Sequence, residues 1–202
     1  MGIIPIRGGE VKLQGQNLLK IKGKQLKIAR QGIQMVFQDP RACLNPKMTI
    51  GQAISDPLLI HKLTNNSQAH EKSRELLTHV GLIPAEEYQN RLPHEISGGQ
   101  QQRVAIARAL ALEPKVIICD ESISMLDAEI QSEVLTLLNK LQKRLGLAIL
   151  FITHDLDIAA GFCNNIIVLD NGQIVEHNTG EHILNNPKSY TAKILAEAYR
   201  KP

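Results

Sequence analysis

Three short apolar runs mark the chain, at residues 33–37, 116–119 and 148–152. Each run is continuous and does not alternate with polar residues, which is typical of a strand buried on both faces of a parallel sheet. Between the second and third runs, apolar residues recur at helical spacing over residues 127–145, and Gly146 supplies a stop. The pattern predicts a β-α-β unit.

The segment between the first two predicted strands has a helical pattern. Residues 49–112 contain no comparable strand run, and turn signals divide them at residues 81–84 and at residues 92–93. We therefore expect one α/β core, formed by residues 1–44 and 113–202, that carries a helical subdomain over residues 45–112.

The end of the chain predicts a hairpin and two short helices. Asp170-Asn171-Gly172 is a tight-turn signal between two apolar runs, at residues 165–169 and 173–176. Helices are expected over residues 180–185 and 189–198.

Composition narrows the class of protein. The 202 residues carry a formal charge of +3 from 23 basic and 20 acidic residues, a balance that does not argue for a nucleic-acid partner. The longest apolar runs are much shorter than the roughly 18 residues of a membrane span, so a cytosolic chain is expected. The three cysteines suit neither a disulfide framework nor a metal cluster, and we expect them to be reduced packing residues.

Two adjacent carboxylates, Asp120 and Glu121, end the second predicted strand. Because a buried strand cannot lead cheaply into two unpaired charges, a ligand site at its carboxyl end is one interpretation. In phosphoryl transfer the first acid can hold magnesium and the second can deprotonate the attacking water. The alternative is a solvated acidic turn, which is common.

A Ser-Gly-Gly-Gln sequence, Ser97, Gly98, Gly99 and Gln100, precedes a helical run. A capping box between Ser97 and Gln100 would explain the two polar residues. It would not explain two glycines in a first helical turn, where each costs about 1 kcal/mol relative to alanine. Close approach of a phosphate to exposed amides at the helix N-terminus would explain them.

Two further polar residues stand at the carboxyl ends of predicted strands. His154 closes the third strand, where it can hydrogen-bond a terminal phosphate, and Gln38 leaves the first strand, where its carbonyl can face a metal or water. A lone histidine is more often structural, so each residue gains weight only beside the other signals.

Together these segments resemble the ATP-binding domain of ABC transporters. Gln38 resembles the Q-loop, ISGGQQQR the signature, VIICDE the Walker B motif, residues 124–127 the D-loop and His154 the switch histidine. The order and spacing agree from Gly9 to the C-terminus. The segments MVFQDPRACLNPKMTIGQAISDPL and NNPKSYTAKILAEA are similar to the oligopeptide, dipeptide and nickel importer branch.

The resemblance implies a P-loop NTPase-like (RecA-like) parallel-sheet core with an inserted helical subdomain, and ATP and Mg²⁺ as cofactors. It implies that Asp120 and Gln38 hold the metal and that Glu121 and His154 are catalytic. Nucleotide contacts would come from Gln38, Ser97, Gly98, Gly99, Gln100 and Asp127.

The implied partners are a second ABC ATPase subunit, identical or different, transmembrane permease subunits and, indirectly, an extracytoplasmic substrate-binding protein. The implied place is the cytoplasmic face of the membrane, where the chain would energise peptide import. The segment near residues 39–54 would press on the permease.

One family motif is absent: no GxxxxGK[ST] string occurs in the 202 residues. Residues 1–6 resemble the tail of the helix after that loop, and residues 8–13 resemble the next strand, so the chain is expected to be truncated at its N-terminus and inactive alone. A second departure is Ser122, where the family usually has proline, and it puts the rigidity of the turn after Glu121 in question.

Three alternative functions are open for the chain. It would be a non-hydrolysing accessory subunit that completes a partner's site, or a decayed fragment without function. The third alternative is a DNA-repair ATPase, but the 58 residues between Gln38 and Ser97 leave no room for the coiled coils of that class.

Overall fold

The computed structural model describes residues 8–200, with side chains described through residue 198. Its centre is a three-stranded parallel sheet in the order β3-β4-β5, whose strands are β3 (Ile33–Val36), β4 (Val116–Asp120) and β5 (Ala148–Ile152). The three predicted strands and their parallel arrangement are confirmed. The register pairs Met35 with Ile118 and Ile118 with Leu150.

The β-α-β unit is also confirmed. Helix α7 (Ala128–Leu145) joins β4 to β5 and buries an apolar stripe that includes Val134 and Leu138. Asp127 caps its N-terminus, and Gly146 ends it in the left-handed conformation that favours glycine.

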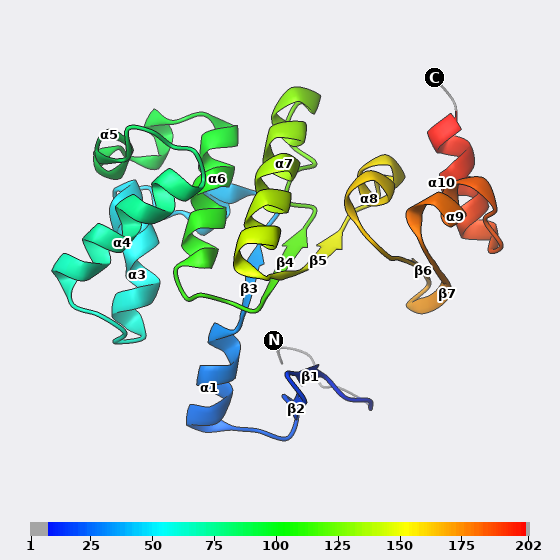
Figure 1. The fold of residues 1–202 in the computed structure, drawn as a ribbon, viewed down its shortest axis with the longest axis horizontal. Coiled ribbons are helices and arrows are strands. Elements are labelled where there is room, and N and C mark those ends of the chain that lie inside the picture. The colour runs from blue at the N-terminus through cyan, green and yellow to red at the C-terminus, as the bar shows by residue number, and fades with distance from the viewer. Residues whose placement is uncertain (1–7, 201–202) are drawn as a thin grey trace.

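Helices occupy the long segment between β3 and β4, as predicted. They are α2 (Pro40–Cys43), α3 (Ile50–Ile60), α4 (Asn66–His79), α5 (Ala85–Asn90), the 3₁₀ helix η1 (Pro93–Glu95) and α6 (Gly98–Leu110). The predicted breaks fall between α4 and α5 and at η1. In Figure 1, α3, α4 and α5 lie together on one side, and α6 stands between them and α7.

The C-terminal part forms a lobe of its own (Figure 1). Helix α8 (Leu156–Phe162) leads into the antiparallel hairpin β6 (Ile166–Asp170) and β7 (Gln173–Asn178), and α9 (Gly180–Asn185) and α10 (Tyr190–Arg200) end the described chain. The predicted hairpin and both terminal helices are present.

The beginning of the described chain departs from its prediction. The strand expected over residues 8–13 is reduced to β1 (Lys12–Leu13), which pairs antiparallel with β2 (Gln16–Asn17). Helix α1 (Gly23–Gln31) follows and buries none of its residues. The helix tail expected at residues 1–6 lies outside the described residues.

The hydrophobic core is divided near residue 156. The larger cluster joins the sheet, α7 and the helices of the insertion, so that Ile54, Val104 and Ile117 share one core. A smaller cluster packs α8 and β6 against α9 and α10 around Ile183. The helical segment and the sheet therefore share one hydrophobic core.

The expectation that the strands are buried on both faces is wrong for β5. Its side chains alternate in exposure, and Leu150 and Ile152 lie exposed on the face that also carries Met35. The opposite face holds Ile117 and packs against the core that includes α6 and α7. Among the described residues no comparable layer covers the first face.

Candidate functional site

The turn after β4 carries the two predicted carboxylates. Asp120 is the last residue of β4 and is opposite Ile152 in the register. Glu121 follows with φ of +45°, a backbone conformation that few residues other than glycine adopt. Its N–H donates to the carbonyl of Ile152 at 2.9 Å, which holds the start of the turn against β5.

The turn is closed by Ser124. Its N–H and its hydroxyl both donate to the carbonyl of Glu121, at 3.1 and 2.9 Å. These bonds hold the left-handed residue in place without the proline that the family usually has after the glutamate.

His154 reaches Glu121 from the neighbouring strand end. Its Nδ1 lies 3.3 Å from Oε1 of Glu121, with the histidine side chain 73% exposed and the glutamate side chain 34% exposed. The contact becomes an ion pair when the imidazole is protonated, and its exposure makes it worth little in stability. Both side chains therefore face solvent and are available to a ligand.

Gln38 joins the same group through Ser124. The Nε2 of Gln38 donates to Oγ of Ser124 at 3.4 Å. Gln38, Ser124, Glu121 and His154 are therefore linked in series, with Ser124 bound to the main-chain carbonyl of Glu121 and His154 to its side chain. The sequence placed Ser124 in the segment that resembles the D-loop, but Ser124 was not predicted to be a site residue. A hydroxyl three residues after Glu121 looks like an ordinary turn residue, and only the fold brings it beside Gln38.

A cavity of about 70 Å³ adjoins this group and is lined by Glu121, Ser124 and His154, with Gln131, Thr153 and Asp155 around them. Neither Asp120 nor Gln38 lines this cavity. Among residues 8–198, no group of three or more histidine, cysteine or acidic side chains is arranged to hold a metal ion. Asp120 would therefore be a single carboxylate ligand to Mg²⁺, which commonly takes one or two carboxylates and fills its shell with water and phosphate oxygens.

Two neighbouring groups have shifted pKa values. Burial raises the pKa of the Cys119 thiol to about 12, against a smaller opposing effect of a hydrogen bond with Ser122. Desolvation and then the negative charge of Asp155 raise the pKa of Asp157. Cys119 is thus a neutral packing residue beneath the acidic turn, and the three cysteines are free thiols, as predicted.

The signature residues lie apart from this group, at the N-terminus of α6. Ser97 caps the helix by accepting from the N–H of Gln100 at 3.3 Å, and Gln100 accepts from the N–H of Ser97 at 2.9 Å. Gln100 also donates to the hydroxyl of Tyr88 at 3.0 Å, a partner that no local pattern indicated. The capping box is therefore present.

The two glycines of this turn have different surroundings. A Cβ on Gly99 would lie 2.6 Å from Cγ2 of Ile130, whereas the nearest atom to a Cβ on Gly98 would be Cδ2 of Leu126, at 3.9 Å. Packing between α6 and α7 thus accounts for Gly99, whereas a Cβ on Gly98 would meet Leu126 only at an ordinary van der Waals distance. Asp127 caps α7 by accepting from the N–H of Ile130 at 3.0 Å.

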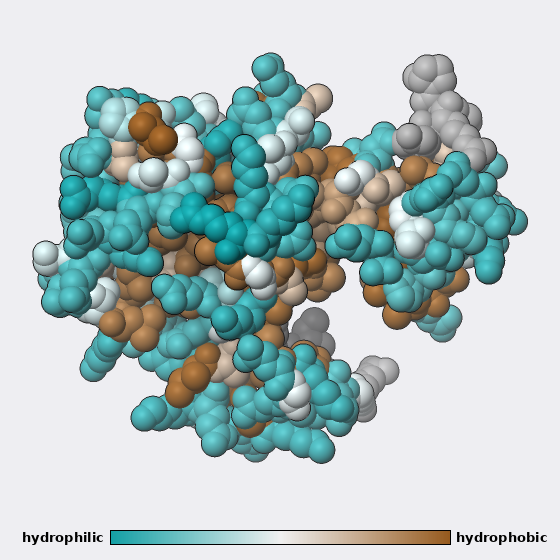
Figure 2. Space-filling model, viewed as in Figure 1, coloured by the Kyte–Doolittle hydropathy of each residue, from teal (hydrophilic) through white to brown (hydrophobic). Residues whose placement is uncertain are grey.

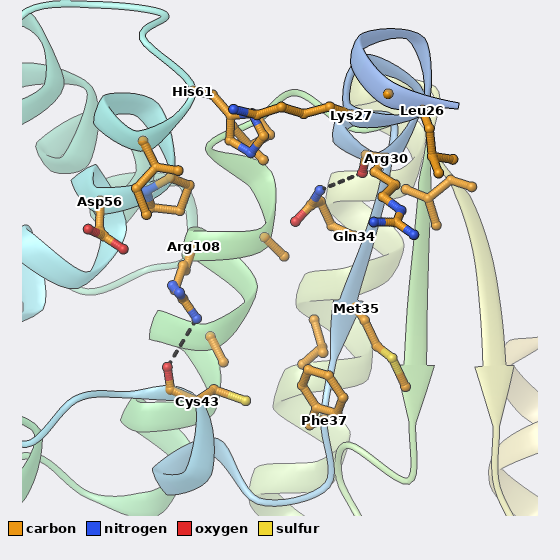
Figure 3. A pocket seen from close by; sticks show the side chains of 18 residues that line it. Leu26, Lys27, Arg30, Gln34, Met35, Phe37, Cys43, Asp56, His61 and Arg108 are labelled. Atoms are coloured by element: carbon orange, nitrogen blue, oxygen red, sulfur yellow. Dashed lines mark hydrogen bonds between the residues drawn. The ribbon is translucent and has the colours of Figure 1, made fainter. Parts of the chain in front are cut away.

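The largest of the described cavities, of about 730 Å³, is elsewhere. It lies between α1, the edge of β3 and the C-terminal ends of α3 and α6, as Figure 3 shows. Arg108 crosses it to donate to the carbonyl of Cys43 at 3.0 Å, and Lys27, Arg30 and His61 line it. None of the predicted site residues lines this cavity.

Comparison with known proteins supplies the context for these residues. The family model described as "ABC transporter" matches residues 1–124. The oligopeptide transport ATP-binding protein OppF of Escherichia coli is 42% identical over 198 residues, which are 97% of this chain and 59% of that protein. The dipeptide transport ATP-binding protein DppF of Escherichia coli is 43% identical over 194 residues, 96% of this chain and 58% of that protein.

The glutathione import ATP-binding protein GsiA of Pectobacterium atrosepticum is 41% identical over 195 residues, 96% of this chain and 31% of that protein. The chain thus spans less than two thirds of the length of these curated relatives.

Solved structures show the same fold. CbiO1 from Clostridium perfringens, described as part of the ABC transporter complex cbiONQ, matches with a TM-score of 0.81 at 29% identity, over 92% of this chain and 71% of that one. The ATP-binding cassette MJ0796, a dimer bound to ADP and Pi, matches with a TM-score of 0.73 at 29% identity, over 91% and 75%. No helix among residues 8–200 is long and apolar enough to cross a membrane.

Proposed function

The chain belongs to the ABC transporter family, and from this premise we propose that it is an ATP-binding subunit of an importer for peptides. The relatives named for oligopeptide, dipeptide and glutathione transport support this substrate class, because each matches nearly the whole chain at above 40% identity. The chain spans only part of those proteins, so their transport activity is proposed for it.

The connected series of Gln38, Ser124, Glu121 and His154 beside Asp120 carries the proposal. In this site, Glu121 takes the proton from the attacking water, because its partly exposed carboxylate is held at the carboxyl end of β4. His154 donates a hydrogen bond to the terminal phosphate, and Gln38 orients the water and would be a ligand to Mg²⁺. Mg²⁺, when bound to Asp120, would neutralise charge on the phosphates.

We assign the second half of the nucleotide site to the N-terminus of α6. Ser97, Gly98, Gly99 and Gln100 would clamp the nucleotide held by a second ABC ATPase subunit, with Asp127 at the boundary between the two chains. Exposed Ser97 and partly exposed Gly98 support this role, because the N-terminus of a helix offers backbone amides and a positive dipole end to an anion. The dimeric state of MJ0796 also supports it.

The membrane side of the assembly would be the segment of residues 39–54, where nucleotide-driven closure is passed to permease subunits. The chain would then sit peripherally on the cytoplasmic face of the membrane. An extracytoplasmic binding protein would deliver the peptide to the permease and contact this chain only indirectly.

A grafted protein tests the assigned roles. The segment of Escherichia coli OppF that precedes the matched region would be joined before Met1, and Mg²⁺-dependent ATP hydrolysis would be measured. Glu121→Gln should lower kcat by about a hundredfold or more while ATP still binds, since a general base contributes at least that factor. Glu129→Gln, an exposed carboxylate on α7, is the matched control and should leave kcat unchanged. Full activity of Glu121→Gln would remove the proposed base.

A second candidate is a non-hydrolysing accessory subunit, and the capped signature turn at Ser97 supports it. The 202 residues lack the amides and lysine of the phosphate loop, and charge-assisted hydrogen bonds contribute roughly 1.5 to 3 kcal/mol each. Without three of them, ATP affinity falls about a thousandfold or more. The capped signature turn is nevertheless formed, so the 202-residue chain would complete a partner's site and fail at its own.

Two measurements decide this candidate. Calorimetric titration of the 202-residue chain with ATP should show no binding in the micromolar range. The grafted protein carrying Gly98→Asp should be inactive as a homodimer, because its signature turn repels phosphate. Adding the unaltered 202-residue chain, with its intact signature, should restore hydrolysis. An absence of restoration would favour a fragment without function.

A further inference from the structure

The positive charge of the chain is concentrated near its beginning. Residues 11–38 contain five lysines, one arginine and no acidic residue, whereas the rest of the chain has 17 basic and 20 acidic residues. This segment therefore has a charge of +6 against −3 for the remainder. Five of its cations, Lys20, Lys22, Lys24, Lys27 and Arg30, fall within eleven residues and are called the basic strip below.

The basic strip lies on the surface, in and just before α1. All five side chains are exposed, and α1 buries none of its residues. Among the described side chains, no carboxylate comes within ion-pair distance of the four strip lysines. Four ammonium groups without counter-ions raise the local potential, so a surface with several negative charges would be attracted to them.

Aliphatic side chains stand among these cations. Ile28 on α1 is 56% exposed, and Leu19, directly before the strip, is exposed as well. In Figure 2, the lobe of α1, β1 and β2 is mostly hydrophilic with hydrophobic residues between. Lysines with interspersed exposed aliphatic residues are typical of segments that lie at a lipid headgroup layer.

The residue types favour lipid over nucleic acid. No aromatic residue occurs between residues 8 and 36, so the lobe has no side chain on which a base could stack. Four of the five strip cations are lysines, which act as point charges and lack the planar fork that arginine uses on bases.

The place of α1 fits the membrane side of the assembly. Leu26, Lys27 and Arg30 line the large cavity of Figure 3 together with Cys43 and Asp56. α1 is thus next to the segment of residues 39–54, which the proposed function turns toward the permease. The nearness of α1 to the permease rests on the proposed function, whereas its charge, exposure and residue types do not.

We propose that the basic strip binds anionic phospholipid headgroups and holds this lobe against the membrane surface. The contact is electrostatic, with Ile28 and Leu19 adding apolar contact at the headgroup boundary. Each cation near an anionic membrane contributes about a fivefold gain in affinity, so four lysines together account for several hundredfold, on the order of 5⁴.

Flotation of the 202-residue chain with lipid vesicles tests the proposal, because flotation separates lipid-bound protein from aggregated protein. The chain should float with vesicles that contain phosphatidylglycerol and not with vesicles of phosphatidylcholine alone, and binding should weaken as salt is added. Changing Lys20, Lys22, Lys24 and Lys27 to glutamine should lower the affinity by about a hundredfold or more.

The matched control removes the same charge from elsewhere. Lys115, Lys140, Lys143 and Lys193 are exposed lysines outside the strip, and changing all four to glutamine should leave most of the binding. Far-ultraviolet circular dichroism of both variants should match that of the unaltered chain, because only exposed side chains are replaced.

Three outcomes would overturn the proposal: no flotation with anionic vesicles, equal losses in the two quadruple variants, or tighter binding to a DNA oligonucleotide than to vesicles at the same salt. The vesicles contain no permease and the assay no nucleotide. Flotation together with an inactive grafted ATPase would therefore reject the proposed function and support the lipid site. An active grafted ATPase without flotation would reject the lipid site and support the proposed function.

Discussion

Ile130 on α7 stands against Gly99 on α6, with its Cγ2 atom 2.6 Å from the position that a Cβ on Gly99 would occupy. Gly99→Ala should therefore destabilise the protein by about 1–3 kcal/mol, because the packed helices must shift to admit one methyl group. Urea unfolding followed by circular dichroism would measure the loss.

Gly98→Ala is the matched control. The nearest atom to a Cβ there would be 3.9 Å away, so the change should be neutral or stabilise by up to about 1 kcal/mol through the higher helix propensity of alanine. Adding Ile130→Ala to Gly99→Ala should recover part of the loss. If Gly98→Ala were as harmful as Gly99→Ala, packing against Ile130 would not be the reason for Gly99.

His154→Ala should change the free energy of unfolding by no more than about 0.5 kcal/mol, since the side chain is largely exposed and its contact with Glu121 is solvated. Leu156→Ala, two residues later, replaces a buried core residue and should cost about 2–5 kcal/mol. Comparing the two variants distinguishes a side chain that is available to a ligand from one that stabilises the fold. A loss of more than 2 kcal/mol in His154→Ala would make the histidine structural.

Glu176 on β7 should make stability depend on acidic pH. Burial raises the pKa of its carboxyl, but hydrogen bonds from the N–H groups of Ser189 and Lys188, at 2.8 to 3.1 Å, act together with the Ser189 side chain and the electrostatic effect of His182 and leave the pKa below its usual value. A carboxyl with a lowered pKa in the folded state stabilises the protein fully above about pH 4.3, and this contribution is lost as the pH falls toward the lowered value.

Glu176→Gln should cost about 1–3 kcal/mol at neutral pH, because charge-assisted bonds to the start of α10 become neutral ones. It should also flatten the fall in stability below pH 4.3, and thermal unfolding at a series of pH values would show both effects. Glu181→Gln, an exposed carboxylate on α9, serves as the control. An unchanged pH profile in Glu176→Gln would contradict the assignment.

Cys119 should resist alkylation in the folded protein. Its side chain is buried and its pKa is raised to about 12, so it supplies almost no thiolate at pH 8. Brief iodoacetamide treatment followed by mass spectrometry should label Cys43 and Cys163, which are only partly buried, before Cys119. Labelling of Cys119 should reach their rate in denaturant. Equal rates without denaturant would contradict the burial.

Local patterns predicted most of the elements from residue 33 onward and named the candidate site residues. Strands β3, β4 and β5, helix α7 with its glycine stop and the β6-β7 hairpin all follow from signals within a few residues of one another. Hydrophobic periodicity and capping are local in origin, because each depends on backbone geometry over one or two turns. Walker B and signature residues are likewise contiguous and could be recognised as they stand.

Contacts between distant residues were beyond such patterns. Gln38 and Ser124 are 86 positions apart, and only the parallel sheet brings the ends of β3 and β4 close enough for the hydroxyl to join them. The exposure of Leu150 and Ile152 was predicted wrongly, because the sequence of a strand does not determine which of its two faces another layer covers. The contact between Ile130 and Gly99 also joins distant residues. The glycine can be seen in the sequence, but the reason for it is a side chain on another helix.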